Sequence, residues 1–595
     1  MSTVSSPTGR RLRRSVDSAN ACAASAKADR RAYLAVLLLL SLLAWAPLLY
    51  PGYFQAHSGF LPLFNLADLA AAPGKLAWLP TVGVTPDLLR GEGPLAYWLA
   101  LLLRPLVGDL GAVKAVFALS IVTTGLGVYG WARRDLANSE GEANDMALYG
   151  LLAGRAGLLA AMVAMLWPPL LATVYVRGAL AEALFMALLP CALWAVSCGR
   201  RPAPHPAPHA SRFTFHALRF VPITLLVAAL FWTQAGLALW ATGLLLIWAL
   251  WPGAIRRSRG QAAGAAAAGA LLGGGLFILL HRAAGLAGPA LDVAGHAVYP
   301  YQLLSPAWGF GDSTSGWQDG LPLQLGFAAL SLALLTVLLG VGRTAHVARF
   351  TLHALRFAAL AAVVLVLLTT TLARPLWRVD LVAATLRYPW QLFALVGPLL
   401  ALLAGAVVVV ERRLAVLPVW AAAVALVALS SYPYLAPRFT QVLPDPAAPM
   451  IFGANQVTLV AGEAGTVGDR PEQVVAGEAG TVGDRPEQVG ETKPLTVTIA
   501  WQALQPLDFD NNVFIHALDA AGNRVAQWDG QPLRAGEPAP MTTWGVGEII
   551  SSAYRLELDP AAAPVQRVLV GLYNWQTGER LLVNGGDSVT LEVGP

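Results

Sequence analysis

The sequence predicts a polytopic α-helical membrane protein that carries a C-terminal all-β domain. Only 13% of its 595 residues are charged, against roughly 25% in a soluble domain, and 56% are hydrophobic. Apolar runs recur from residue 32 to residue 429, and period-two alternation replaces them from residue 495 onward. These observations exclude an ordinary soluble enzyme and place most of the chain in a lipid bilayer.

About eleven apolar runs are long enough to cross a hydrocarbon core of roughly 30 Å as helices. Two of them are short and share residues 221–251, where Thr233 and Gln234 interrupt the run. Arginines flank this run on both sides, so the positive-inside rule requires an even number of crossings there. The remaining spans are 32–49, 111–131, 157–174, 178–196, 264–280, 323–341, 357–372, 392–410 and 414–429.

The arginine distribution also predicts topology and domain boundaries. Residues 1–31 form a basic cytoplasmic tail before an uncleaved first span, and the C-terminus lies outside the plasma membrane. A transmembrane domain at 32–430, with outer loops 50–110, 281–322 and 373–391, precedes a linker at 431–494. The pI near 9.1 reflects the inside loops, so nucleic acid is not implied. Three cysteines are too few for a disulfide framework.

Two segments of the sequence are repeated. RFTFHALRF at 212–220 recurs as RFTLHALRF at 349–357, each time before a span. We interpret it either as an interfacial anchor for anionic headgroups or as a duplicated DNA segment tolerated in loops. The 15 residues VAGEAGTVGDRPEQV at 460–474 are duplicated unchanged at 475–489, and their composition indicates a surface loop.

Residues 495–595 are predicted to form an extracytoplasmic β-sandwich. Six alternating stretches begin with LTVTIAWQA and end with DSVTLEVG, separated by Gly, Asp, Asn and Pro turns. Four tryptophans in this region could stack on sugar rings, although a core position is the commoner use of each: Trp501, Trp528, Trp544 and Trp575.

The first outer loop carries the candidate acids and bases. A carboxylate that faces a membrane-level cleft can act as general base toward an acceptor hydroxyl. Two of the three carboxylates are explained equally well as a helix-end and a turn residue. The catalytic candidates are Asp68, Asp87 and Glu92, and the candidate substrate contacts in this loop are His57, Ser58 and Arg90.

Arg177 and Glu182 lie at the mouth of a predicted span and are candidate substrate-binding residues. Ionisable groups at membrane depth are costly, so each is expected to have a function and a partner. Glu182 could pair with Arg177, Lys114 or Arg104, and a purely structural pair is equally compatible with the sequence.

Two later outer loops add polar and cationic candidates. Gln302 and Asp319 lie among aromatic residues, a mixture that suits carbohydrate or lipid headgroups but also an interfacial aromatic belt. Arg374, Arg378 and Arg387 place positive charge on the outer side, which points to an anionic ligand such as a phosphate.

Several motifs together resemble a known family. HSGF, GEGPLAYWL, YVRGALAEAL, YPYQLLSPAWGFG and RYPWQL are similar to bacterial multipass proteins called 6-pyruvoyl-tetrahydropterin synthase-related, which look like a branch of the GT-C glycosyltransferases. The resemblance covers about residues 32–434 and implies inverting transfer of a sugar from a polyprenyl-phosphate donor. It also implies an Asp where this chain has Ser58 and an Arg where it has Gln391. Serine is no general base without its own activator, so Asp68, Asp87 or Glu92 would have to replace it.

Two functions therefore stay open. The first is sugar transfer from a polyprenyl-phosphate donor to an extracytoplasmic acceptor, which is an envelope glycan or a protein. The alternative is a non-catalytic membrane protein that presents or helps export cell-envelope polysaccharide. No residue set predicts a metal site, and a divalent cation is left open as a cofactor. Transport is weaker, because the spans lack matched Gly/Pro-interrupted helices with central charges.

Overall fold

The computed structural model of the chain describes a helical unit and a β unit. The helical unit comprises Met1–Tyr50, Leu69–Thr81 and Thr85–Pro437, and the β unit comprises Pro51–Asp68, Val82–Val84 and Arg438–Pro595. The described residues are 31–54, 56, 58–71, 78, 88–137, 143–200, 219–281, 292–310, 313, 315–317, 320–342, 349–440, 450–452, 456–466, 495–504, 507, 509–534, 536–545, 548–558, 564–583 and 587–593.

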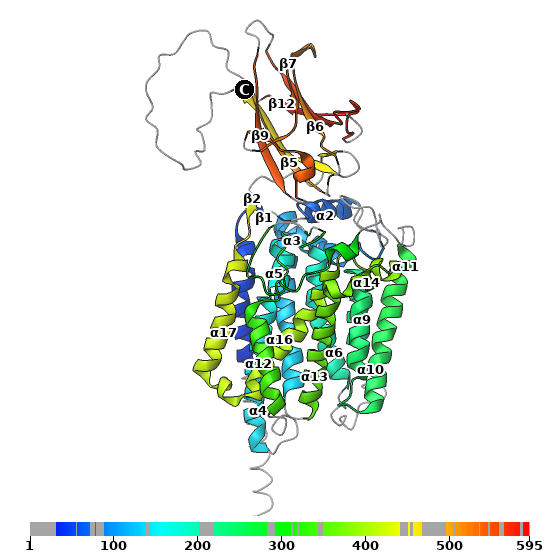
Figure 1. Cartoon of the computed structure of the whole chain (residues 1–595), viewed down its shortest axis with the longest axis vertical. Coiled ribbons are helices and arrows are strands. Elements are labelled where there is room, and N and C mark those ends of the chain that lie inside the picture. The colour runs from blue at the N-terminus through cyan, green and yellow to red at the C-terminus, as the bar shows by residue number, and fades with distance from the viewer. Residues whose placement is uncertain are drawn as a thin grey trace, which may run out of the picture. The chain divides into compact units, whose positions relative to one another are not determined.

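The helical unit contains long apolar helices that run side by side (Figure 1). Within the described ranges, eight are long and apolar enough to cross a membrane by length and composition. They are Arg31–Leu49, α3 (Leu95–Leu136), α4 (Ala143–Met165), α6 (Leu180–Arg200), α10 (Arg256–Gly269) continuing through η2 (Ala270–Gly274) and α11 (Gly275–Leu280), α13 (Arg349–Thr369), η6 (Pro389–Leu392) with α16 (Phe393–Val410), and α17 (Leu417–Ser431) with η8 (Tyr432–Leu435).

Three shorter apolar helices fall on the other predicted spans: α8 (Val221–Phe231), α9 (Ala235–Leu250) and α12 (Phe327–Gly342). The break predicted near Thr233 and Gln234 is confirmed, since it separates α8 from α9. Short α14 (Arg374–Trp377) and α15 (Asp380–Ala383) lie between α13 and η6.

Two features of the helical unit differ in detail from the predicted spans and loops. The span 157–174 is interrupted, because α4 ends at Met165 and a separate helix, α5 (Pro168–Tyr175), follows. Proline has no N–H to donate and suits the first turn of a new helix, which explains the break. Part of the predicted loop 50–110 is helical, since α3 begins at Leu95 and kinks at Gly108, whose φ is +70°.

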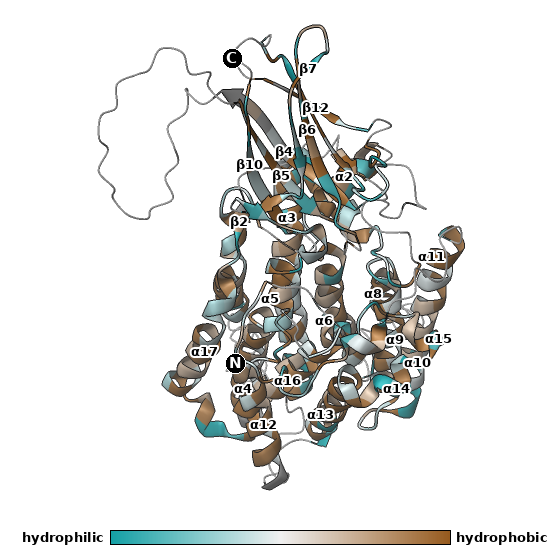
Figure 2. Ribbon diagram, turned by 45° about the horizontal axis from the view of Figure 1, so that its top comes forward, coloured by the Kyte–Doolittle hydropathy of each residue, from teal (hydrophilic) through white to brown (hydrophobic). Residues whose placement is uncertain are grey.

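Helix α16 is the centre of this unit, and almost every residue in it is buried. It packs against α4, α12 and α13. The outer helices instead expose large apolar side chains, including Leu39, Leu271 and Leu429. Such surface is unfavourable in water and suits hydrocarbon, and Figure 2 shows the hydrophobic residues along the helices. The helical unit is therefore that of a polytopic membrane protein.

The β unit contains two four-stranded antiparallel sheets, ordered β10-β5-β4-β3 and β12-β11-β6-β7. One apolar core draws on both sheets, which is how a β-sandwich buries its inner faces. The six predicted strands are confirmed as β5 (Leu495–Ala503), β6 (Asn512–Leu518), β7 (Arg524–Gly530), β10 (Ile549–Leu556), β11 (Arg567–Tyr573) and β12 (Val589–Glu592).

The β unit has further strands besides these six. Strands β3 (Met450–Phe452) and β4 (Val457–Thr466) extend the first sheet into the stretch assigned to a linker. The rest of the duplicated segment lies outside the described residues. Strand β1 (Tyr53–Phe54) pairs with β2 (Phe439–Thr440), helix α2 (Leu61–Ala71) follows β1, and β8 (Leu533–Arg534) pairs with β9 (Glu537–Pro538).

Candidate functional site

The break between α8 and α9 fixes the segment that carries Glu92. The backbone N–H of Gly93 donates to the Thr233 carbonyl at 2.7 Å, and that of Leu95 donates to the Trp232 carbonyl at 3.0 Å. Carbonyls at a helix end lack partners within the helix and accept bonds from outside. The interruption in the predicted span therefore anchors the start of α3.

Gly236, at the start of α9, brings two loops together. Its N–H donates to the Leu89 carbonyl at 2.9 Å, and a Cβ built on it would lie 1.8 Å from the carbonyl oxygen of Thr385. A side chain at this position would need the backbone to move. Arg90 also donates to the Ala383 carbonyl at 3.0 Å, so the segment before Glu92 is held against the loop that leads to Arg387.

Glu92 lies among other charged groups. The Tyr97 hydroxyl donates to Glu92 Oε2 at 2.5 Å. Burial raises the pKa of the Glu92 carboxyl, and the negative charge of Glu182 raises it further. The hydrogen bond from Tyr97 and the positive charges of Arg177 and Arg387 lower the pKa. The net result is a carboxyl with a raised pKa that is within electrostatic reach of two cations and a second carboxylate.

Arg177 and Glu182 form the predicted ion pair. Arg177 donates to both carboxylate oxygens of Glu182, at 2.6 and 2.8 Å. The Trp390 ring lies 4.5 Å from the guanidinium, so the cation is also in cation–π contact. Gln391 donates to Glu182 Oε2 at 3.3 Å. Lys114 and Arg104, the other predicted partners, instead contact the Tyr50 carbonyl and Asp109.

An aromatic row continues from Trp390. Tyr388 stacks on Trp390 with centroids 4.9 Å apart, and the His296 ring lies 4.8 Å from Tyr388. Ser313 Oγ accepts from Trp390 Nε1 at 3.0 Å and lies 3.1 Å from His296 Nδ1. Burial lowers the pKa of the His296 imidazole, and the negative charge of Asp292 opposes that change.

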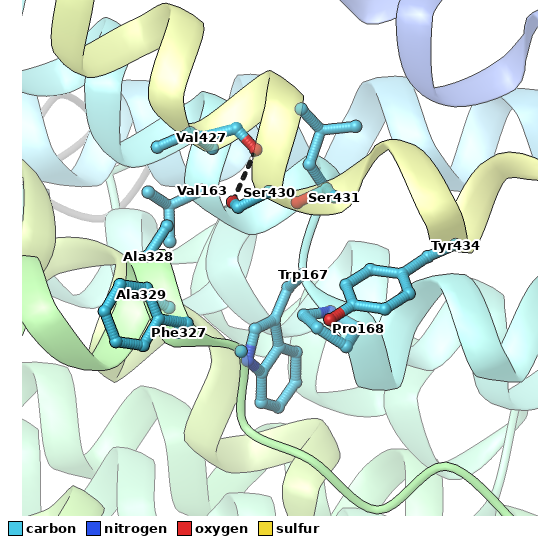
Figure 3. Close-up of a pocket in the computed structure, with 12 residues that line it drawn as sticks. Val163, Trp167, Pro168, Phe327, Ala328, Ala329, Val427, Ser430, Ser431 and Tyr434 are labelled. Carbon is cyan, nitrogen blue, oxygen red and sulfur yellow. Dashed lines mark hydrogen bonds between the residues drawn. The ribbon is translucent and has the colours of Figure 1, made fainter. Parts of the chain in front are cut away.

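The ion pair borders a small crevice that is partly open. Arg177, Glu182, Thr173 and Trp390 line its polar side, and apolar residues of α5, α6, α16 and residues 321–323 line the rest. A second small crevice lies between Trp167 and α17 and is mainly apolar (Figure 3). Ser430 Oγ, in that crevice, donates to the Val427 carbonyl at 3.0 Å.

Helix N-termini gather around this site. Glu92 lies just before the start of α3, which is hydrogen-bonded to the residues before α9. Glu182 lies in the first turn of α6, and it accepts a hydrogen bond from Gln391 of η6. A helix N-terminus carries a partial positive charge and unpaired N–H groups, which favour anions. The Leu95 and Gly236 N–H groups already donate to carbonyls, so what the starts of α3, α6 and α9 offer a negatively charged group is mainly their partial positive charge.

Several predicted residues lie in the β unit or outside the described residues. Ser58 and Asp68 belong to the β unit, where Ser58 accepts a bond from the Leu61 N–H in the turn before α2. His57, Asp87 and Asp319 lie outside the described residues. Of the two catalytic candidates among the described residues, Asp68 and Glu92, the structure places Glu92 in the charged cluster.

The three arginines of the 373–391 loop have different surroundings. Arg374 donates to the Tyr299 hydroxyl at 2.9 Å, and Arg378 is exposed. Arg387 is within electrostatic reach of Glu92. Gln302 is buried, and its side chain accepts from the Tyr299 N–H at 2.7 Å. Gln302 thus holds the loop backbone.

Sequence reasoning missed Tyr97, Tyr388 and Trp390 as members of the site. All three are within the quoted motifs GEGPLAYWL and RYPWQL, so the motifs were the available indication. It also missed Gly236, because a close backbone approach leaves no mark in hydropathy.

No group of three or more His, Cys, Asp or Glu side chains that could hold a metal ion occurs in the part of the chain that the structure describes. The fold and the cluster define a polytopic helical membrane protein with C-terminal antiparallel β-sheets and a buried charged site.

Comparison with known proteins gives a distant structural likeness and no family assignment. No family model matches the sequence, and no curated protein matches it. The chain is similar to ArnT from Cupriavidus metallidurans bound to undecaprenyl phosphate (TM-score 0.41, 14% identity, 68% of this chain and 75% of that chain). It is also similar to apo ArnT from the same organism (0.36, 14%, 64% and 60%) and to the apo Archaeoglobus fulgidus oligosaccharyltransferase (0.37, 13%, 67% and 56%).

Proposed function

We propose that this protein is a membrane glycosyltransferase that moves a sugar from a polyprenyl-phosphate donor onto an extracytoplasmic acceptor, with Glu92 as general base. The observation that carries the proposal is the cluster of Glu92, Glu182, Arg177 and Arg387 beside the starts of α3 and α6. Transfer from a phosphate donor needs a base and positive charge close together, and this cluster supplies both.

Glu92 suits the role of base. Because its pKa is raised, its carboxylate holds a proton more strongly than an exposed glutamate does, while it remains ionised above that pKa. In the reaction, the acceptor hydroxyl gives its proton to Glu92 as its oxygen bonds to the anomeric carbon. The bond between that carbon and the donor phosphate oxygen breaks, the phosphate keeps the electron pair, and the configuration inverts.

Arg387 and the helix N-termini suit the donor phosphate. Positive charge near the leaving phosphate stabilises the charge that builds up as the bond breaks. Arg177 has a different role in the proposal, because Glu182 and Trp390 already contact its guanidinium. We assign Arg177 and Glu182 to the fixed frame of the crevice, whose apolar wall suits the less polar parts of the donor.

The test uses the full-length protein in lipid nanodiscs with undecaprenyl-phosphate-linked hexose, pentose and amino-sugar donors. Release of undecaprenyl phosphate, with water or an added envelope glycan as acceptor, is followed by mass spectrometry. We expect release with at least one donor and a loss of roughly a hundredfold or more in Glu92→Gln, the usual range for a missing general base. Asp68→Asn is the matched carboxylate control and keeps its activity.

The possible outcomes distinguish a wrong function from a wrong assignment of the general base. If no donor is turned over or bound, sugar transfer is the wrong function. Binding without release favours the non-catalytic alternative. If Asp68→Asn loses activity and Glu92→Gln keeps it, the function stands and the base is misassigned.

A further inference from the structure

Trp575 differs from the other tryptophans of the β unit by its exposure. It is 53% exposed, whereas Trp501 and Trp544 are buried in the core and Trp528 packs on the Tyr554 ring. The ring of Phe509 lies near it, with centroids 6.4 Å apart and planes at 25°. An indole left outside the core forgoes part of its contribution to folding, so the nearly parallel pair of exposed Trp575 and half-buried Phe509 calls for an explanation.

The turn that carries Trp575 is fixed by its own hydrogen bonds. Asn574 Oδ1 accepts from the N–H groups of Gln576 and Thr577 at 2.9 and 3.2 Å. Asn574 also exchanges backbone bonds with Glu579 and Gly578, both at 2.8 Å, and Gly578 has a φ of +74°. A ring held in place before binding loses little conformational entropy when a ligand docks.

The sheet face beside this turn is polar and aromatic. Tyr573 is paired in register with Asn512, whose side-chain amide donates to the Tyr573 hydroxyl at 3.4 Å. Because Val513, Ile515 and Leu572 are core residues, the alternation of a strand turns Asn512 and Tyr573 to the opposite face.

Charged groups of both signs lie on this face. The Arg580 guanidinium covers the Phe514 ring at 4.2 Å and pairs with Asp587 at 2.7 Å. Asp529 lies opposite Phe514 in the register of β6 and β7, so this face carries charged groups of both signs beside its amides and hydroxyls. An anionic membrane surface would call for excess Lys and Arg instead.

We propose that Phe509, Asn512, Tyr573 and Trp575 form an aromatic face that binds a neutral saccharide chain. A sugar ring presents an apolar face of C–H groups, which stacks on aromatic rings, and a rim of hydroxyls, which pair with amide and phenol groups. A face with charges of both signs does not select a strongly charged ligand. The inference rests on the β unit alone and does not depend on sugar transfer by the helical unit.

The experiment uses the full chain in nanodiscs, because glycoside detergents would compete for a saccharide site. Maltoheptaose, cellohexaose and mannohexaose are immobilised, and Kd is measured by biolayer interferometry. We expect at least one of them to bind and Trp575→Ala and Phe509→Ala each to weaken it by about tenfold, while Trp575→Phe retains most binding.

Leu582→Ala is the matched control, because Leu582 is 65% exposed in the same unit but has no aromatic ring. Its binding stays at the wild-type level, as does that of Glu92→Gln, which separates this site from the proposed catalytic one. Circular dichroism confirms that each variant is folded. The proposal is overturned if none of the three saccharides binds, if Trp575→Ala binds like wild type, or if Leu582→Ala is as damaging as Trp575→Ala, since the last result indicates an apolar partner.

Discussion

The Tyr97 hydroxyl donates a hydrogen bond to Oε2 of Glu92 at 2.5 Å. The bond favours the charged carboxylate and so lowers the pKa of Glu92, while burial raises it by more. Tyr97 thus acts on the residue that the proposed mechanism needs in its ionised form. The acidic limb of a pH–rate profile reports the pKa of such a base.

Removal of the Tyr97 hydroxyl is predicted to raise the pKa of Glu92. In Tyr97→Phe the opposing hydrogen bond is gone, so the pKa of Glu92 rises further and the acidic limb of kcat/KM moves to higher pH. Glu182→Gln removes a neighbouring negative charge that raises the pKa of Glu92, so the limb moves to lower pH. Profiles of undecaprenyl phosphate release measure both. Shifts of the same sign would contradict the assignment of the limb to Glu92.

The Arg177 and Glu182 pair is expected to stabilise the fold only as a pair. Their side chains are 15% and 6% exposed, and loss of one partner leaves a poorly solvated charge. Arg177→Met and Glu182→Leu should each destabilise the protein by about 3–5 kcal/mol, while the double variant recovers most of the loss. The free energies of unfolding of the wild type, the two single variants and the double variant are measured with denaturant in detergent. Additive losses would show that the two residues act separately.

The close approach at Gly236 predicts a sharp difference between two glycines of α9. Gly236→Ala places a Cβ against the Thr385 and Leu89 carbonyls, which costs about 1–3 kcal/mol and displaces the loops before Glu92 and Arg387. Gly243→Ala meets no atom within 4 Å and should be neutral or stabilising by up to about 1 kcal/mol. Thermal unfolding and donor turnover are measured for both. Equal effects would mean that the approach does not matter to the site.

Hydropathy and charge predicted most of the helical unit because spans are set by long apolar runs. The break at Thr233 and Gln234 followed from arginine placement, yet its role in holding Glu92 did not, because a helix-end carbonyl that accepts a distant N–H has no sequence pattern. The interruption of the span 157–174 was not predicted because composition stays apolar across Trp167 and Pro168.

The candidate site was only partly predictable for a related reason. Arg177 and Glu182 are five residues apart and adjoin one helix start, so their pairing was a local inference. Glu92 could not be separated from Asp68 and Asp87, since all three are carboxylates of one loop. The position of Glu92 in the charged cluster depends on contacts of its neighbours with residues more than a hundred positions away, such as Thr233 and Ala383.

The 373–391 loop offers a matched test of the phosphate assignment. Gln391 Oε1 accepts from the Arg387 N–H at 3.0 Å, which fixes the backbone of the arginine near Glu92, whereas Arg378 is exposed. Arg387→Ala should raise KM for the undecaprenyl-phosphate sugar about ten- to a hundredfold, the usual worth of a charged contact, and Arg378→Ala should change it little. Steady-state kinetics with one donor gives the KM of both variants for comparison with the wild type. A larger effect from Arg378→Ala would place the phosphate on the exposed side of the loop, away from Glu92, and Glu92 could then not serve as the base for that donor.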